Sequence, residues 1–81
     1  MMKPEEIEQL VHGALSDVEV QVGGDGRHFQ AVVVSPDFEG VPRIKRHRMV
    51  YDALREHIDG DVLHAISMQT MTPAERERKA G

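Results

Sequence analysis

Two histidines stand where an imidazole could bind a metal. His64 lies in the apolar stretch Leu63–Ile66, and His28 stands directly before Phe29, at the end of a glycine-rich loop. A neutral imidazole binds iron or zinc through one ring nitrogen when the other nitrogen is held by a hydrogen bond. Simpler roles compete with this chemistry. By spacing alone, His64 is more often a half-buried strand residue on the same face as Ile66 and Met68, and His28 is equally often a solvated turn residue.

A run of positive charge is the second feature that could do chemistry. Within residues 43–48 the chain carries four cations and no acid, namely Arg43, Lys45, Arg46 and Arg48. Arginines near the start of a helix can bind phosphate or a partner carboxylate through paired hydrogen bonds. The net charge of the chain is −4, which disfavours general attraction to nucleic acid or anionic membranes. A solvated helix face, a protein or glutathione contact and a nucleic-acid contact all stay open for this run.

The other histidines have simpler interpretations. His47, inside the basic run, is interpreted as packing against or capping the start of a helix. His12 and His57 are interpreted as surface residues.

The composition narrows the class of protein. The chain has 81 residues and no cysteine, so it has room for one modest core and offers neither a disulfide nor a thiolate metal site. The sequence lacks a Gly-x-Ser-x-Gly elbow, a paired-histidine zinc motif and a phosphate-binding loop, so we expect a protein without enzymatic activity. The charged segment 1–6 and the lack of a long apolar run predict no signal peptide and no membrane span. We expect one cytoplasmic domain over residues 1–81.

Helical spacing predicts three helices. The first covers residues 4–15. The second follows Pro42 and ends at Gly60, since glycine commonly ends a helix. Its apolar stripe is expected to contain Ile44, His47, Tyr51, Leu54 and Ile58, with Val50 and Ala53 beside it. Thr72 as N-cap, with Glu75 three residues later, is the capping-box signature of a short last helix.

Strand patterns at residues 18–22, 29–34 and 62–69 complete an α+β fold. The turn Gly23–Gly26 makes the first two strands an antiparallel hairpin. Because a helix links the second strand to the third, a right-handed crossover makes those two parallel. The prediction is an α-β-β-α-β-α order with a three-stranded mixed sheet and helices on one face. The residues expected to be largely buried are Ile7, Leu10, Leu15, Phe29, Tyr51, Leu54 and Ile66.

These segments together resemble the BolA family, in particular its short, cysteine-free bacterial branch of the IbaG type. The likeness covers nearly the whole chain and is most specific in Arg46–Tyr51 and Leu63–Ile66, with support from Gly26–Phe29 and Phe38–Gly40. BolA proteins share a class II KH-like fold, which agrees with the predicted order of elements. The resemblance implies a non-enzymatic role in iron–sulfur trafficking and in the iron or stress response.

The resemblance also implies a partner and a cofactor. BolA proteins pair with a monothiol glutaredoxin and share a two-iron two-sulfur (2Fe–2S) cluster with it and with glutathione. In this family the histidine at the position of His64 ligates the shared cluster. A second ligand comes from the loop between the first two strands, where His28 is a better candidate than Asp25 because a carboxylate is a hard ligand. The isolated protein is expected to hold no cofactor, and to be a monomer or a weak dimer.

An alternative of a different class is a nucleic-acid-binding transcriptional regulator. The KH-like fold and the cations Arg43, Lys45, Arg46 and Arg48 suggest it. However, the Gly-x-x-Gly loop that clamps nucleotides in KH domains is absent, and Gly40-Val-Pro-Arg43 stands roughly in its place. Any binding to nucleic acid is therefore expected to be weak.

Overall fold

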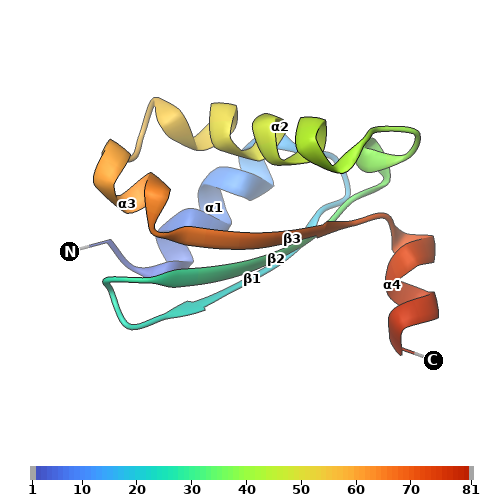
Figure 1. The fold of residues 1–81 in the computed structure, drawn as a ribbon, viewed down its shortest axis with the longest axis horizontal. Coiled ribbons are helices and arrows are strands. Elements are labelled where there is room, and N and C mark those ends of the chain that lie inside the picture. Colours follow the sequence, from blue (N-terminus) through green and yellow to red (C-terminus); the bar gives the residue numbers. More distant parts are fainter. Residues whose placement is uncertain (1, 81) are drawn as a thin grey trace.

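The chain folds as a three-stranded sheet with a layer of helices over one face (Figure 1). The computed structural model describes residues 2–80. Its elements in chain order are α1 (Pro4–Ala14), β1 (Glu19–Gly24), β2 (Phe29–Val34), the 3-10 turn η1 (Pro36–Phe38), α2 (Arg43–Arg55), α3 (Gly60–His64), β3 (Ile66–Met71) and α4 (Pro73–Ala80). The predicted α+β class is confirmed.

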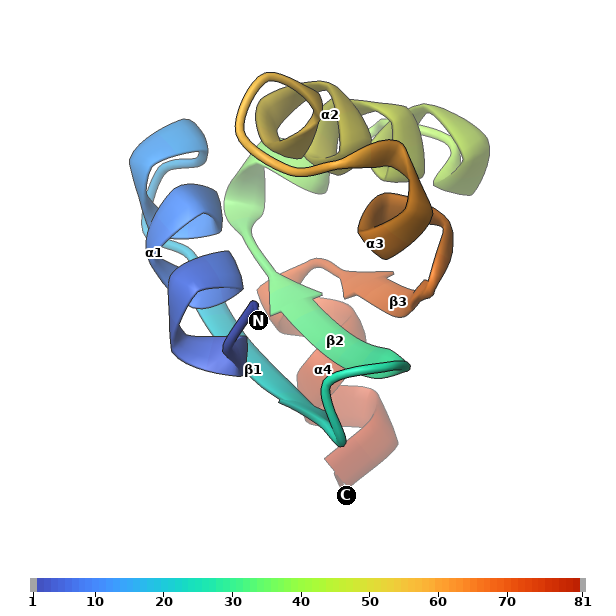
Figure 2. The ribbon, with the colours of Figure 1, turned by 90° about the vertical axis from the view of Figure 1, so that its left-hand side faces the viewer.

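The sheet is mixed, as predicted. β1 and β2 pair antiparallel, with Val22 opposite Ala31. β2 and β3 pair parallel, with Phe29 opposite Ile66. The strand order is β1-β2-β3, so β1 and β3 form the two edges. The crossover from β2 to β3 runs through α2 and α3, which lie over the same face of the sheet as α1 (Figure 2).

The core lies between the sheet and this helical layer. Phe29 and Val33 of β2, Ile7 of α1 and Leu54 of α2 are each at most 1% exposed. The central strand therefore forms the floor of the core, with helices from both halves of the chain above it. Of the residues expected to be buried, Ile7, Phe29, Leu54 and Ile66 are confirmed, whereas Leu10, Leu15 and Tyr51 are only partly buried.

The buried stripe of α2 differs from the predicted one. Its buried residues are Arg46, Val50 and Leu54, whereas Ile44 is 73% exposed. The three buried residues follow one another at intervals of four, which places them on one face of the helix. Apolar spacing alone left out Arg46 and rotated the expected stripe toward Ile44. The prediction was wrong because this arginine has hydrogen-bonding partners inside the fold.

The segment before β3 is a helical turn rather than a strand. α2 ends at Arg55, and Gly60, which was expected to end it, instead begins α3. Within α3 the Leu63 N–H donates to the Asp59 carbonyl at 2.9 Å, and β3 starts only at Ile66. A short apolar run fits a strand and a helical turn alike. Here the helical turn is favoured over a strand because it places Leu63 in the core. The turn α3 connects α2 to the sheet (Figure 2).

The short last helix is confirmed together with its cap. The Thr72 N–H donates to Glu75 Oε1 at 2.8 Å, and the Glu75 N–H donates to Thr72 Oγ1 at 3.2 Å. α4 extends from the end of β3 away from the helical layer (Figure 1), and its Arg76 forms an ion pair with Glu19 of β1. Within residues 2–80, no helix combines the length and the apolar character needed to cross a membrane.

Candidate functional site

His64 is the last residue of α3, and its side chain is exposed. The adjacent Leu63 is buried, and because successive helical residues point in directions about 100° apart, His64 turns toward solvent. The expectation of a half-buried position on a strand is thereby corrected. An exposed imidazole at the end of a helical turn is accessible to a second molecule.

His28 is carried by an ordered hairpin loop. Asp25 Oδ1 accepts hydrogen bonds from the backbone N–H groups of Arg27 and His28, both at 2.9 Å. The N–H of His28 and then that of Arg27 lower the pKa of Asp25, because they stabilise its ionised carboxylate. Gly24 has φ +155°, and a Cβ there would lie 2.3 Å from the His28 carbonyl oxygen. The loop therefore fixes the backbone of the exposed His28, and the Asp25 carboxylate is engaged in hydrogen bonds within the loop.

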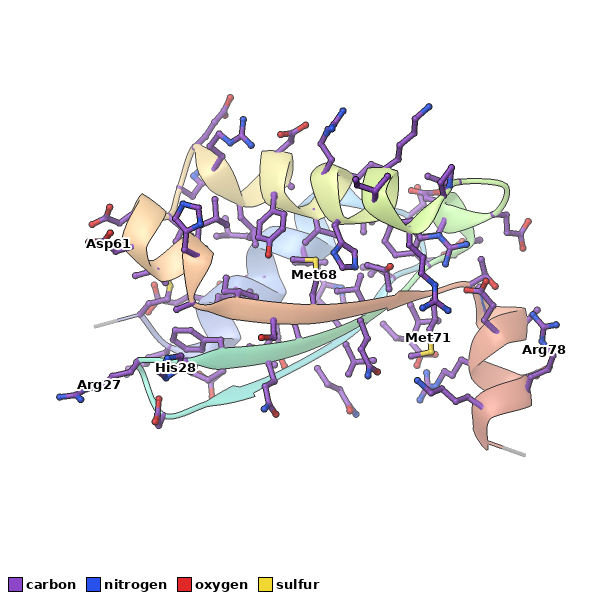
Figure 3. All side chains as sticks on the ribbon, viewed as in Figure 1. Arg27, His28, Asp61, Met68, Met71 and Arg78 are labelled. Atoms are coloured by element: carbon purple, nitrogen blue, oxygen red, sulfur yellow. The ribbon has the colours of Figure 1, made fainter. Side chains whose placement is uncertain are left out.

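The two histidines lie at the same end of the sheet. The Phe29 N–H donates to the Ala65 carbonyl at 2.9 Å, which joins the start of β2 to the start of β3. His28 precedes Phe29 and His64 precedes Ala65, so the two histidines flank this hydrogen bond, each just before the start of a neighbouring strand. Figure 3 shows His28 at this end of the sheet, on the same side as Asp61 of α3.

Two imidazoles are the ligands that this chain can bring to such a site. Within residues 2–80, no three His, Cys, Asp or Glu side chains gather closely enough to hold a metal ion by themselves. The sequence contains no thiolate. A metal centre at His64 and His28 would therefore need its remaining ligands from another molecule, and the exposure of both rings fits such a site.

Arg46 was predicted as a surface contact, and the structure corrects this. It is 6% exposed. Its Nε donates to the Val41 carbonyl at 2.7 Å, its Nη1 donates to Glu75 Oε1 at 2.7 Å, and its guanidinium lies 5.8 Å from the centroid of the Phe38 ring. The Arg46 guanidinium and the Thr72 N–H together lower the pKa of Glu75 to about 2. Arg46 thus joins the loop before α2 to the capping box of α4.

Sequence reasoning found the capping role of Glu75 but missed its ion pair with Arg46. The two residues are 29 positions apart, so no local spacing connects them. The one available signal was that Arg46 lies four residues before the apolar Val50, on the same helical face.

The remaining predicted residues lie at the surface. Arg43, Lys45 and Arg48 of α2 are exposed, and so are His12 and His57, as expected. His47 is partly buried. The exposed cations of the basic run, residues 43–48, are therefore three rather than four.

Comparison with known proteins identifies the family of this fold. Residues 8–75, which include His28 and His64, match the family model described as BolA-like protein. The chain belongs to the BolA family. This BolA protein is 44% identical over 80 residues to the acid stress protein IbaG of Escherichia coli (strain K12), covering 96% of this chain and 95% of that one. The resemblance to the IbaG branch is confirmed.

Solved structures agree with the assignment. A BolA protein homologue from Coxiella burnetii has a TM-score of 0.84 and 46% identity, over 96% of this chain and 100% of that one. The BolA domain of SufE1 from Arabidopsis thaliana has a TM-score of 0.75 and 31% identity, over 89% of this chain and 93% of that one. At these identities and coverages the whole BolA fold is shared.

Proposed function

We propose that this BolA protein is a non-enzymatic adaptor that pairs with a monothiol glutaredoxin and completes a shared 2Fe–2S cluster. The observation that carries the proposal is the placement of two exposed histidines, His64 and His28, at adjacent strand starts. The names of its relatives give further support. One is an acid stress protein, which favours a role in the stress response, and another is a BolA domain within SufE1.

Each histidine has a distinct part in this proposal. His64 offers its ring from the end of α3, where the buried Leu63 anchors the turn. His28 offers its ring from a loop whose backbone is held by Asp25 and Gly24. The two histidines would bind iron of the cluster, and the thiolates of the glutaredoxin cysteine and of glutathione would be its remaining ligands. Because the chain has no cysteine, it contributes neutral ligands only, and this suits a cluster that is to be transferred or sensed rather than permanently kept.

The nucleic-acid alternative has less support. Arg46 is not available to contact a phosphate, because its guanidinium is bonded to Glu75 and to the Val41 carbonyl inside the fold. Arg43, Lys45 and Arg48 keep their exposed charges, but the protein around them has a net charge of −4. We therefore do not favour nucleic acid as the main partner.

Anaerobic reconstitution tests the proposal. The protein is mixed with a monothiol glutaredoxin, glutathione, ferrous iron and sulfide, and the mixture is separated by size exclusion with absorption recorded across the visible range. We expect a coloured complex with one copy of each protein, whose spectrum differs from that of glutaredoxin reconstituted alone. A BolA protein that elutes apart, next to an unchanged glutaredoxin spectrum, would refute the partnership.

A further inference from the structure

A basic groove runs along the outer edge of β3, toward the opposite end of that strand from His64. Its lining consists of Arg43, Ile44 and His47 of α2, residues 68–71 of β3, and Lys79 of α4, and its volume is about 410 Å³. Among the described residues no acidic side chain lines it. Figure 3 shows Met68 between α2 and β3, and Met71 beside α4. The groove is thus positively charged on an acidic protein, and Ile44 adds an exposed apolar side chain.

Alternate residues of β3 direct their backbone groups into this groove. The carbonyls of Ala65 and Met71 accept hydrogen bonds from the β2 side, at 2.9 and 3.0 Å. In a parallel strand pair, alternate residues bond to the neighbouring strand and those between them point the other way. Residues 66, 68 and 70 therefore direct their N–H and C=O groups toward the outer edge.

Two of these outward carbonyls are already occupied. The Tyr51 hydroxyl donates to the Ile66 carbonyl at 3.1 Å, and Arg46 Nη1 donates to the Thr70 carbonyl at 3.4 Å. Within the described chain, the edge is left with the N–H of Ile66, the N–H and C=O of Met68 and the N–H of Thr70. The Thr70 hydroxyl, buried in the same lining, also has no hydrogen-bonding partner there. A ligand that pairs with all of these groups must offer both donors and acceptors.

We infer that this groove binds an extended acidic peptide segment, which adds to β3 as a fourth strand. One peptide residue opposite Met68 would exchange both backbone hydrogen bonds with it, as in an antiparallel pair. Carboxylates of the peptide would meet Arg43 and Lys79, and an apolar side chain would contact Ile44. The strand Ile66–Met71 has no charge and no proline, so it lacks two of the features that commonly prevent pairing at a sheet edge.

Two other occupants fit less well. A nucleic acid would bring phosphates to the cations but no regular row of donors to the free Met68 carbonyl. Among the described residues, His47 is the one ring in the lining, and no Phe, Tyr or Trp stands there for base stacking. A second copy of β3 would bring no carboxylate to Arg43 and Lys79, because the strand contains none. An acidic peptide supplies both the backbone groups and the charge.

The test uses the isolated full chain and needs neither iron nor glutaredoxin, so its outcome is independent of the cluster proposal. The probe is a fluorescent, acetylated and amidated seven-residue peptide that alternates Glu and Val. Binding is followed by fluorescence anisotropy, and backbone amides of the protein are followed by NMR. We expect saturable binding, weakened by salt, with the largest amide shifts at Met68 and Thr70. A peptide N-methylated at every residue, which cannot complete the ladder, should not bind.

Charge reversal gives a matched control. Arg43→Glu with Lys79→Glu should weaken binding about tenfold, since each reversal removes an exposed attraction. Arg27→Glu with Arg55→Glu changes the net charge equally, away from the groove, and should leave the affinity within about twofold. Equal binding of the N-methylated peptide, or shifts confined to other residues, would overturn the inference. So would no peptide binding, or the same amides responding instead to a single-stranded oligonucleotide or to self-association.

Discussion

Replacing Arg46 by alanine should destabilise the fold substantially, although the residue belongs to a basic surface run. The change removes the hydrogen bond to the Val41 carbonyl, the ion pair with Glu75 and the packing over Phe38. The Arg46 side chain is 8% exposed, so water can replace these contacts only in part. A hydrogen bond to a charged group contributes about 1.5–3 kcal/mol. We therefore expect the free energy of unfolding to fall by about 2 kcal/mol, which lowers Tm by roughly 8 to 16 °C in a domain of this size.

The matched control is Arg48→Ala, two residues further along α2. Arg48 is exposed, so its truncation should change the free energy of unfolding by no more than about 0.5 kcal/mol. Both variants are compared with the parent by urea unfolding followed by circular dichroism, where an unchanged m-value licenses the comparison. Arg46→Lys should fall between them, because an ammonium cannot reproduce the guanidinium's divided contacts. Equal stabilities for the Arg46→Ala and Arg48→Ala variants would refute the structural role.

Three further predictions follow from the loop, the cap and the surface charge. Glu75, whose pKa is lowered from 4.5 to about 2, stabilises the fold above about pH 4.5 and loses this contribution as the pH falls toward 2. Urea unfolding across this range should show a weaker pH dependence for Glu75→Gln. Gly24→Ala should shift the amide signal of His28 in NMR spectra while leaving α4 signals in place. DNA should bind weakly at physiological salt, and Arg43→Glu with Lys45→Glu should reduce the salt dependence of that binding; tight binding insensitive to salt would contradict the low weight given to nucleic acid.

The hairpin of the first two strands and the last helix could be predicted from the sequence because their signals are local. β-branched residues mark β2 over Phe29–Val34, and glycines mark the hairpin before it. Thr72 and Glu75, three residues apart, form the capping-box pattern that predicts the start of α4. The turn α3 could not be separated from β3 in the same way, because a short apolar run carries no distinguishing period.

The candidate site was predicted in part for a similar reason. The family resemblance pointed to His64 and His28, and the structure places them at adjacent strand starts. Exposure of His64 depends on α3, which the local pattern did not reveal. Burial of Arg46 depends on Glu75, a partner distant in sequence. Periodicity ranks side chains by hydrophobicity and so cannot indicate that a charged residue has its partner elsewhere in the fold.

The most direct test of the proposed cluster role is a histidine scan of the reconstituted complex with glutaredoxin. His64→Ala, His28→Ala and the control His57→Ala, an exposed histidine between α2 and α3, are compared by visible absorption, visible circular dichroism and cluster lifetime. We predict that His64→Ala keeps its fold and its contact with glutaredoxin while its spectrum moves toward that of the glutaredoxin dimer. His28→Ala should change the spectrum less, and His57→Ala should not change it. An unchanged spectrum and an unchanged cluster lifetime for His64→Ala would contradict the account.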